Sequence, residues 1–487
     1  MAGLGSYHPS WDGPHCFIVE PPPVFSIQGY SWYQDPTPNS YPGLDSTEEP
    51  MRFVKIEMFD LDSNGSQSLG SMYTDEDGWF EFNDISNVDS NGTGGQDVFF
   101  EVTAQNTRVV VLKDVYSNKH IWATPVAYDL ADGFYDTLMI ASVDESKPFF
   151  VADAILDGHS AWESQWPPNQ YFVPYGQVFL MADSMSSGYD SYNDLIFIND
   201  SVDNNNGWPD TWNRSTMLHE FGHRISSTYS FCDDTTNSPS SHLPWVAYNL
   251  QFAAMEGFAH WWSAFVDSTP IRTYYWDDFT DSLWLNFENG EYGHTTADGS
   301  FNAMGPKCEG AVAGILWDIF DNPDDGYSDR ADWGTLNLGP HYDGIDDYIQ
   351  EGSDDILDAL LNRYYGPNRP DNIHEFHQTW FQSPDLGYCQ EMYNLFYEHG
   401  DSLQPPPKSC SCCLNRGNVD NIIDRIPIDI SDLVYLVDFM FTGGPPPPCW
   451  EQGSVDGDAA SDIDVNDLIY LIDWMFTGGD APPSCPQ

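Results

Sequence analysis

The sequence contains few basic residues. Lysine and arginine together number 16 among 487 residues, against 76 aspartates and glutamates, and the formal net charge at pH 7 is −60. Binding to nucleic acids or anionic membranes needs clusters of basic side chains, so this charge excludes both as general functions. The chain is nevertheless expected to fold, because 41% of its residues are hydrophobic and 15% are aromatic. The length predicts about three domains, with the charge balanced by counterions, bound calcium or a saline medium.

The sequence also lacks a hydrophobic run long enough to cross a membrane. Residues 1–7 have neither the basic nor the apolar part of a secretory signal peptide. Four of the nine cysteines are scattered and five lie within residues 410–485, and they do not form the two Cys-x-x-Cys pairs of a zinc ribbon. Such cysteines favour disulfides in an oxidising compartment, with buried free thiols as the alternative. We therefore expect an extracellular or cell-surface protein whose signal peptide has been removed.

Composition and apolar spacing divide the chain into five segments and predict a multidomain α+β protein. Residues 1–50 are rich in Pro and Gly and are expected to form an extended lead-in with little core. Short strands separated by acidic turns predict an antiparallel β-sandwich over residues 51–149. A mostly helical domain is predicted over residues 150–404, followed by a Pro/Cys linker at 405–412. A small helical domain is predicted at 413–487.

The predicted sandwich is marked by four short apolar runs, at residues 53–59, 79–82, 98–102 and 109–112. The stretch Tyr-Thr-Asp-Glu-Asp-Gly-Trp-Phe at residues 73–80 resembles a hairpin of transthyretin-like or carboxypeptidase-regulatory domains. That resemblance implies a sandwich of the transthyretin-like type.

The strongest chemical motif is His-Glu-Phe-Gly-His at residues 219–223. Histidines at positions i and i+4 of a helix lie on one face, so His219 and His223 can bind one zinc ion. Glu220 can then act as general base toward a metal-bound water. A β-like run at residues 194–200 precedes the motif, and Asp210 is a candidate N-cap of its helix. The alternative is a surface helix with two polar residues.

A catalytic zinc ion needs a third protein ligand. Metzincins would have Gly and His at positions 226 and 229, where this sequence has Ser226 and Tyr229. Glu256 is the better candidate, because it lies in the otherwise apolar segment 250–262 and a buried carboxylate is costly unless it is paired or metal-bound. The alternative is an acid paired with an arginine or capping a helix.

The motif at 219–223 followed by Glu256 on a second helix resembles the gluzincins, the thermolysin-like clan of secreted zinc metallopeptidases. The resemblance covers residues 150–404 and implies a zincin fold with an edge strand along the cleft. His260 occupies the position of an aspartate that in thermolysin orients a zinc histidine. We expect the donor for the developing oxyanion to be His260 or His294.

One turn in the predicted sandwich has oxygen ligands at alternate positions. Asp60, Asp62 and Asn64 match the first half of an EF-hand-type calcium loop, with Gly65 where the chain turns. No glutamate follows at the twelfth position, and Asx-Gly turns also occur without metal. The sequence is compatible with a calcium site at this turn and with a turn that binds no metal.

The C-terminal domain contains an internal repeat. Residues 428–444 recur as 463–479 with an offset of 35, and 12 of the 17 positions are identical. Each copy combines an acidic loop with a helix of apolar spacing, which resembles type I dockerins. The resemblance implies calcium, best supported in the second loop by Asp456, Asp458, Asp464 and Asp467, and a cohesin-like or cell-surface partner through residues 413–487. The loops exceed the usual length, and a small helical cap without ligands is the alternative.

These features predict an extracellular zinc-dependent endopeptidase that hydrolyses peptide bonds through a metal-activated water. The alternative is a non-enzymatic surface or filament-forming structural protein that retains a peptidase-like fold. A carbohydrate-binding accessory protein, suggested only by the 18 tryptophans, is a third hypothesis.

Overall fold

The structure is a computed structural model. It describes residues 23–35, 47–88, 95–114, 117–167, 170–181, 186–200, 210–233, 242–269, 271–276, 281–287, 291–294, 297–300, 306–320, 353–361, 369–382, 392, 395–396, 416–420, 428–442, 444, 447, 450–457 and 463–484. The chain divides into two compact units. The first contains residues 1–34, 48–104 and 121–142, and the second contains the remainder.

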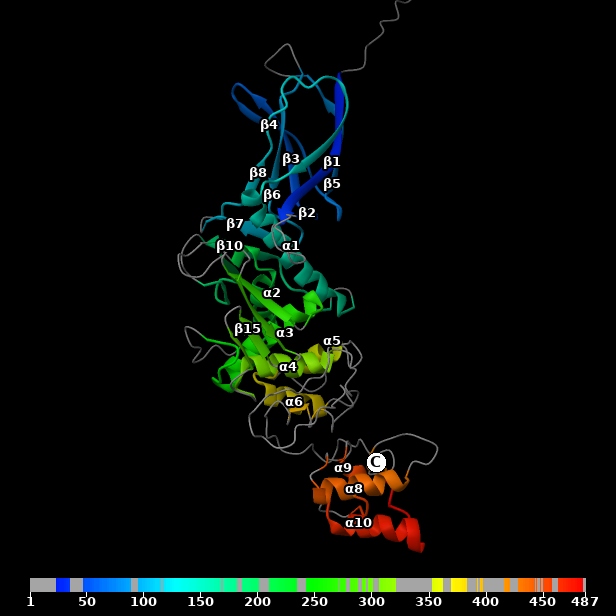
Figure 1. Ribbon diagram of the computed structural model, residues 1–487. Helices are drawn as coiled ribbons and strands as arrows, with labels where there is room; N and C mark the ends of the chain where they lie inside the picture. Colours follow the sequence, from blue (N-terminus) through cyan, green and yellow to red (C-terminus); the bar gives the residue numbers. More distant parts are fainter. Residues whose placement is uncertain are drawn as a thin grey trace, which may run out of the picture. The chain divides into compact units, whose positions relative to one another are not determined.

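The first unit contains two four-stranded sheets (Figure 1). One sheet has the order β2 (Thr47–Pro50), β1 (Val24–Asp35), β5 (Trp79–Ser86), with β9 (Gly133–Ile140) parallel to β1. The other has the order β4 (Gly65–Tyr73), β3 (Lys55–Asp62), β6 (Val98–Thr103), β8 (Ile121–Ala123), and its pairs are antiparallel.

The core of this unit lies between the two sheets. Strand β1 buries alternate side chains, among them Phe25 and Ile27, as a strand with one covered face does. Phe80 and Phe82 of β5 contact Phe100 of β6, with ring centroids 5.4 and 6.0 Å apart. The inner faces of the two sheets therefore pack against each other.

Three strands depart from the sequence-based assignment. Strand β9 is parallel to β1, so the expectation of an antiparallel sandwich is wrong for this pair. Strand β1 lies within residues 1–50, so the expectation of a lead-in with little core is wrong for residues 24–35. Strand β7 (Val109–Leu112) was assigned to the sandwich but pairs in parallel with a strand of the second unit. All four of its residues are buried, which is typical of a strand covered on both faces.

The second unit contains a sheet of order β11 (Gly188–Asp190), β12 (Leu195–Asn199), β10 (Gly176–Met181), β7. Strand β10 is parallel to both its neighbours, and β11 is antiparallel to β12. The predicted edge strand at residues 194–200 is therefore not the outer strand, because β11 covers it.

Helices dominate the rest of the second unit. They are α1 (Val143–Ser164), α2 (Arg214–Tyr229), α3 (Leu250–Asp267), α4 (Glu309–Phe320), α5 (Ser353–Leu360) and α6 (Ile373–Gln382), with a short helix η1 (Asp210–Trp212). Strands β13 (Ile271–Trp276), β14 (Asp281–Asn286), β15 (Glu291–His294) and β16 (Ala297–Ser300) form an antiparallel sheet. The expected mixed α+β class is confirmed. Within the described residues, none of the helices combines the length and the apolar character that a membrane crossing requires.

Helices α1, α2 and α3 pack closely. A side chain at Gly222 of α2 would place its Cβ 3.0 Å from the Ala259 Cα of α3, so glycine permits this crossing. Arg214 at the start of α2 forms ion pairs with Asp157 of α1 at 2.9 Å and Asp267 of α3 at 2.8 Å. These contacts hold the motif helix α2 against the helix that carries Glu256.

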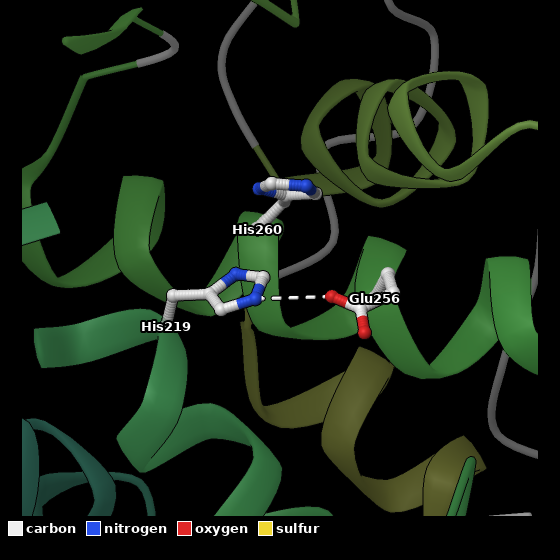
Figure 2. A group of neighbouring side chains, drawn as sticks. All are labelled: His219, Glu256 and His260. Carbon is white, nitrogen blue, oxygen red and sulfur yellow. Dashed lines mark hydrogen bonds and ion pairs between the residues drawn. The ribbon is translucent and has the colours of Figure 1, made fainter. Parts of the chain in front are cut away.

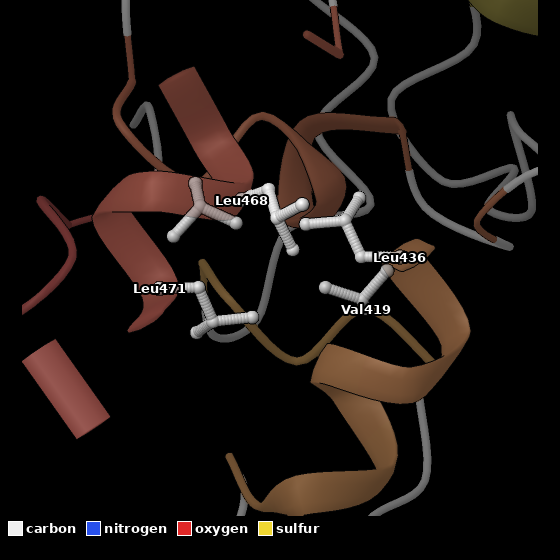
Figure 3. Close-up of a cluster of buried hydrophobic side chains, with 5 residues drawn as sticks. Val419, Leu436, Leu468 and Leu471 are labelled. Carbon is white, nitrogen blue, oxygen red and sulfur yellow. The ribbon is translucent and has the colours of Figure 1, made fainter. Parts of the chain in front are cut away.

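The two copies of the repeat form helices α8 (Ile430–Thr442) and α10 (Val465–Ile472), the last continued by η2 (Asp473–Thr477), and the short helix α9 (Trp450–Gly453) lies between the copies. Their common core is a set of five buried aliphatic side chains, shown in Figure 3: Val419, Leu436, Val455, Leu468 and Leu471. Leu436 and Leu471 occupy equivalent repeat positions, so the two copies share one small core.

The disulfide prediction fails for the two cysteines that the structure describes. Cys232 and Cys308 are buried free thiols, and the other seven cysteines lie outside the described residues. Burial raises the pKa of the Cys308 thiol to about 11. Its Sγ donates to the Pro244 carbonyl at 3.1 Å, so this cysteine has a packing role.

Candidate metal centre

Helix α2 starts at a local signal. Asn213 is its N-cap, and its side chain accepts a hydrogen bond from the Thr216 backbone N–H at 3.2 Å. Asp210, the cap expected from the sequence, opens the preceding helix η1 instead. From this start, the helical period places His219 and His223 one turn apart on the face toward α3.

Three donor atoms converge between α2 and α3. The Glu256 Oε2 atom lies 3.1 Å from His219 Nε2 and 3.3 Å from His223 Nε2, and the two imidazole nitrogens are 3.1 Å apart. Figure 2 shows the His219 ring facing the Glu256 carboxylate, with His260 beside them. Tetrahedral zinc with bonds of about 2.0–2.1 Å holds neighbouring ligand atoms about 3.3–3.4 Å apart. The triangle therefore fits one face of a zinc tetrahedron.

The charges at the triangle suit a cation. Burial by itself would raise the pKa of Glu256, but the neighbouring His223 and His219 hold it well below its usual range. Burial opposes the charge of His223, yet the Glu256 carboxylate raises the pKa of this imidazole. The carboxylate is thus ionised and buried, and a divalent ion would satisfy it together with two neutral imidazoles.

The other predicted catalytic residues have different outcomes. Glu220 is buried on α2, and its charge acts on His223. His260 of α3 is 2% exposed, and its ring centroid lies 4.6 Å from that of His219. A ligand atom of His260 lies within 4.8 Å of those of His219 and Glu256. His294 belongs to β15, but its side chain lies outside the described part.

The sequence reasoning missed a second group beside the triangle. His242 Nδ1 lies 3.0 Å from both carboxylate oxygens of Glu309, and its Nε2 lies 3.8 Å from the Glu256 Oε1 atom. Burial would lower the pKa of His242, but the hydrogen bond to Glu309 and the charge of Glu256 raise it to about 9. Glu309 is an acid in an apolar helical segment, the same signal that identified Glu256.

The predicted calcium ligands of the first unit lie at the end of β3. Asp60 is 2% exposed, and its Oδ1 accepts a hydrogen bond from the Asp97 backbone N–H at 2.8 Å. Asp62 pairs with Gly65 across the hairpin, and Asn64 lies in the turn between them. Calcium at this turn stays a prediction.

In the C-terminal repeat, Asp467 is 1% exposed. Its two oxygens accept hydrogen bonds from the backbone N–H groups of Asp456 at 3.1 Å and Asp464 at 2.8 Å. Burial and the charge of Asp456 raise the pKa of Asp467 to about 6. Asp458 lies outside the described residues. Calcium in this loop also stays a prediction. The carboxylates of Asp456 and Asp467 are close enough to repel each other, and a bound cation would relieve that repulsion.

Comparison with known proteins adds one family. Residues 187–392 match the family described as Mycolysin C-terminal domain. The matched segment contains the donor triangle and supports a relationship to zinc metallopeptidases. No curated protein matches the chain.

Among solved structures, a 9R-lipoxygenase from Cyanothece PCC8801 aligns with 15% identity and a TM-score of 0.15. The alignment covers 30% of this chain and 25% of the lipoxygenase chain. This chain thus spans about a quarter of that structure, and the likeness carries no functional argument.

Proposed function

We propose that this protein is an extracellular zinc-dependent endopeptidase of the gluzincin type. The observation that carries the proposal is the buried triangle of His219, His223 and Glu256, whose spacing suits zinc with its fourth position open. The family match over residues 187–392 supports the same activity and an extracellular location.

The roles of the residues follow from their chemistry. When bound, zinc supplies a Lewis acid that polarises a peptide carbonyl and lowers the pKa of water. His219, His223 and Glu256 would hold that ion. Glu220 would take a proton from the attacking water and deliver it to the leaving amine. His260, buried beside His219, would orient that imidazole, the role that the sequence resemblance suggested for its position.

Substrate binding is expected along the outer strand of the sheet formed by β11, β12, β10 and β7. Strand β11 is the antiparallel outer strand, and α2 packs against it. Its residues are partly exposed, and an extended peptide can add to such a strand through backbone hydrogen bonds. An unstructured peptide segment is therefore the expected substrate form.

The experiment combines zinc analysis with hydrolysis of an unfolded protein substrate. We expect one zinc ion per chain, and Glu220→Gln should abolish hydrolysis while the zinc content stays unchanged, because Glu220 is not a ligand. Gln378→Glu on the exposed surface of α6 is a matched control that should retain activity. A wild-type protein that binds no zinc and cleaves nothing would instead favour the structural, filament-forming alternative.

We also propose that residues 413–487 dock to a cell-surface or cohesin-like protein. Four apolar side chains on each helical segment are exposed by 37–63%: Ile430, Val434, Val437 and Phe441 in the first copy, and Val465, Ile469, Ile472 and Phe476 in the second. Each residue of one row has its equivalent 35 positions later in the other. Apolar rows on a monomer typically mark a partner surface.

The docking proposal predicts a paired effect. Phe441→Ser and Phe476→Ser should each weaken adsorption to a cohesin-type domain, and the double variant should weaken it further. Zinc content and hydrolysis should not change. Unchanged adsorption by the double variant, or no adsorption by the wild type, would contradict a cohesin-type partner.

A further inference from the structure

The carboxylate of Glu256 is approached from two sides. Its Oε2 atom faces the two motif histidines, whereas its Oε1 atom forms an ion pair with His242 Nε2 at 3.8 Å. The opposite ring nitrogen of His242 lies 3.0 Å from Glu309, which is 0% exposed. The side chains thus form a chain from a fully buried carboxylate, through an imidazole, to the outer oxygen of the candidate zinc ligand.

The main chain on both sides of this pair is clamped together. The Gly310 N–H donates to the Pro244 carbonyl at 3.0 Å, and the Tyr248 N–H donates to the Lys307 carbonyl at 2.8 Å. The loop that carries His242 and the first turn of α4 that carries Glu309 therefore form one hydrogen-bonded piece. The distance between these two side chains is set by backbone contacts as well as by their own hydrogen bond.

The His242 ring is also held by its neighbours. Its centroid lies 5.0 Å from that of Phe252 in an edge-to-face arrangement, and 6.4 Å from that of Tyr248. The Tyr248 hydroxyl in turn accepts a hydrogen bond from the Leu243 backbone N–H at 2.8 Å. Such support is what fixes an imidazole in one orientation.

A glycine lets this piece approach Glu256. A Cβ on Gly257 would lie 2.6 Å from the Val312 Cβ and 2.9 Å from the Glu309 carbonyl oxygen. Only a residue without a side chain allows α4 to lie this close to the position next to the zinc ligand. The approach of Glu309 and His242 to Glu256 is therefore built into the packing of α3 and α4.

A second metal ion at His242, Glu256 and Glu309 fits the geometry less well. The two carboxylates meet different ring nitrogens of His242, and these nitrogens point in different directions. One ligand atom from each of the three side chains lies within 4.8 Å of the others, but an ion can contact only one nitrogen of an imidazole, so an ion on Nε2 would leave Glu309 as the partner of Nδ1. A carboxylate–histidine–carboxylate arrangement without a second metal accounts for every distance.

We propose that His242 and Glu309 act together as a positioning arm for the zinc ligand Glu256. Glu309 orients His242, and the His242 imidazole attracts the outer oxygen of Glu256 across the 3.8 Å ion pair, so that the other oxygen faces the metal. This inference rests on the proposed zinc centre, which supplies the ligand role of Glu256. Neither residue of the arm is a metal ligand or touches the reacting atoms.

The test measures zinc affinity in a double-variant cycle, by competition with a chromophoric chelator. The variants are His242→Gln, Glu309→Gln and the combination, with His374→Gln on α6 as a control histidine outside the arm. We expect each arm variant to lower zinc affinity by about 10–100-fold, as the loss of such outer partners does. The double variant should lose no more than the larger single loss, because both changes disable one device.

Two further measurements distinguish a loss of the positioning arm from a general effect on folding. Visible absorption of the cobalt-substituted protein should change in the arm variants and not in the control, because the Glu256 carboxylate has reoriented. Melting of the zinc-free proteins shows whether each variant folds. The His242 side chain is 32% exposed, so His242→Gln is the tolerant variant if Glu309→Gln does not fold.

The outcomes are distinct. Zinc affinities within twofold of the wild type, or losses that simply add in the double variant, would overturn the arm. Two zinc ions per wild-type chain and one per arm variant would identify a second metal site in its place. A wild-type chain without any zinc would overturn the proposed function, and the arm with it.

Discussion

The substitution Gly257→Ala tests the packing that brings α4 to the candidate metal centre. The new Cβ would lie 2.6 Å from both the Cβ and the Cγ1 of Val312. Carbon atoms pack at about 3.5–4.0 Å, so α4 or Val312 must move by about 1 Å. Overpacking of this kind costs about 1–3 kcal/mol, and alanine returns about 1 kcal/mol through its helix propensity. We expect a net loss of up to about 2 kcal/mol in unfolding free energy.

The same movement affects the arm. Glu309 is the first residue of α4, and its 3.0 Å contact with His242 becomes too long for a hydrogen bond if α4 shifts. Zinc affinity should therefore fall together with stability. The assays are calorimetric melting of the zinc-free protein and chelator competition, with Gly188→Ala as a control because nothing lies within 4 Å of a Cβ at that glycine. Raised stability with unchanged zinc affinity would show that the packing at Gly257 does not control the position of α4.

Two further predictions concern pH and calcium. Burial, together with the charges of Arg224 and Arg108, lowers the pKa of His159 to about 3. Below about pH 6.5 this histidine is therefore protonated in the unfolded chain but stays neutral in the folded chain. Stability should fall as the pH drops through this window, by about 2 kcal/mol between pH 6.5 and pH 5 from this group. His159→Leu should flatten that fall in urea unfolding, whereas an equally steep fall would assign the acid sensitivity to other groups. Chelation of calcium should lower protection from hydrogen exchange in α8 and α10 before that of α2 and α3, because the carboxylates of Asp456 and Asp467 then repel each other without a cation. Unchanged exchange would mean that these loops are only acidic surface suited to a saline medium.

Local patterns in the sequence were enough to predict the three side chains that meet in the triangle. The spacing of His219 and His223 places both on one helical face whatever the rest of the fold. Glu256 was found because an acid in an apolar helical segment needs a partner. The structure brings these three together, with His260 beside His219.

Contacts between distant segments could not be predicted in this way. The run at residues 109–112 reads as a strand in any sheet, and only the packing of β10 decides that it belongs to the second unit. Likewise β1 pairs with β5 and β9, which are distant from it in the sequence. The two exposed rows of the C-terminal helices have the same apolar spacing as a core face. Only the folded structure shows that Leu436 is buried and Phe441 is exposed.

Helical period and repetition are properties of neighbouring residues, so the sequence predicts the three side chains of the triangle, the helix that carries the motif and the register of the C-terminal repeat. The meeting of His242 and Glu309 with Glu256 is seen only in the folded chain. Those side chains come from a loop and a later helix start, and no period links them. Their meeting depends on the space that Gly257 leaves between α3 and α4, which is a property of packed surfaces.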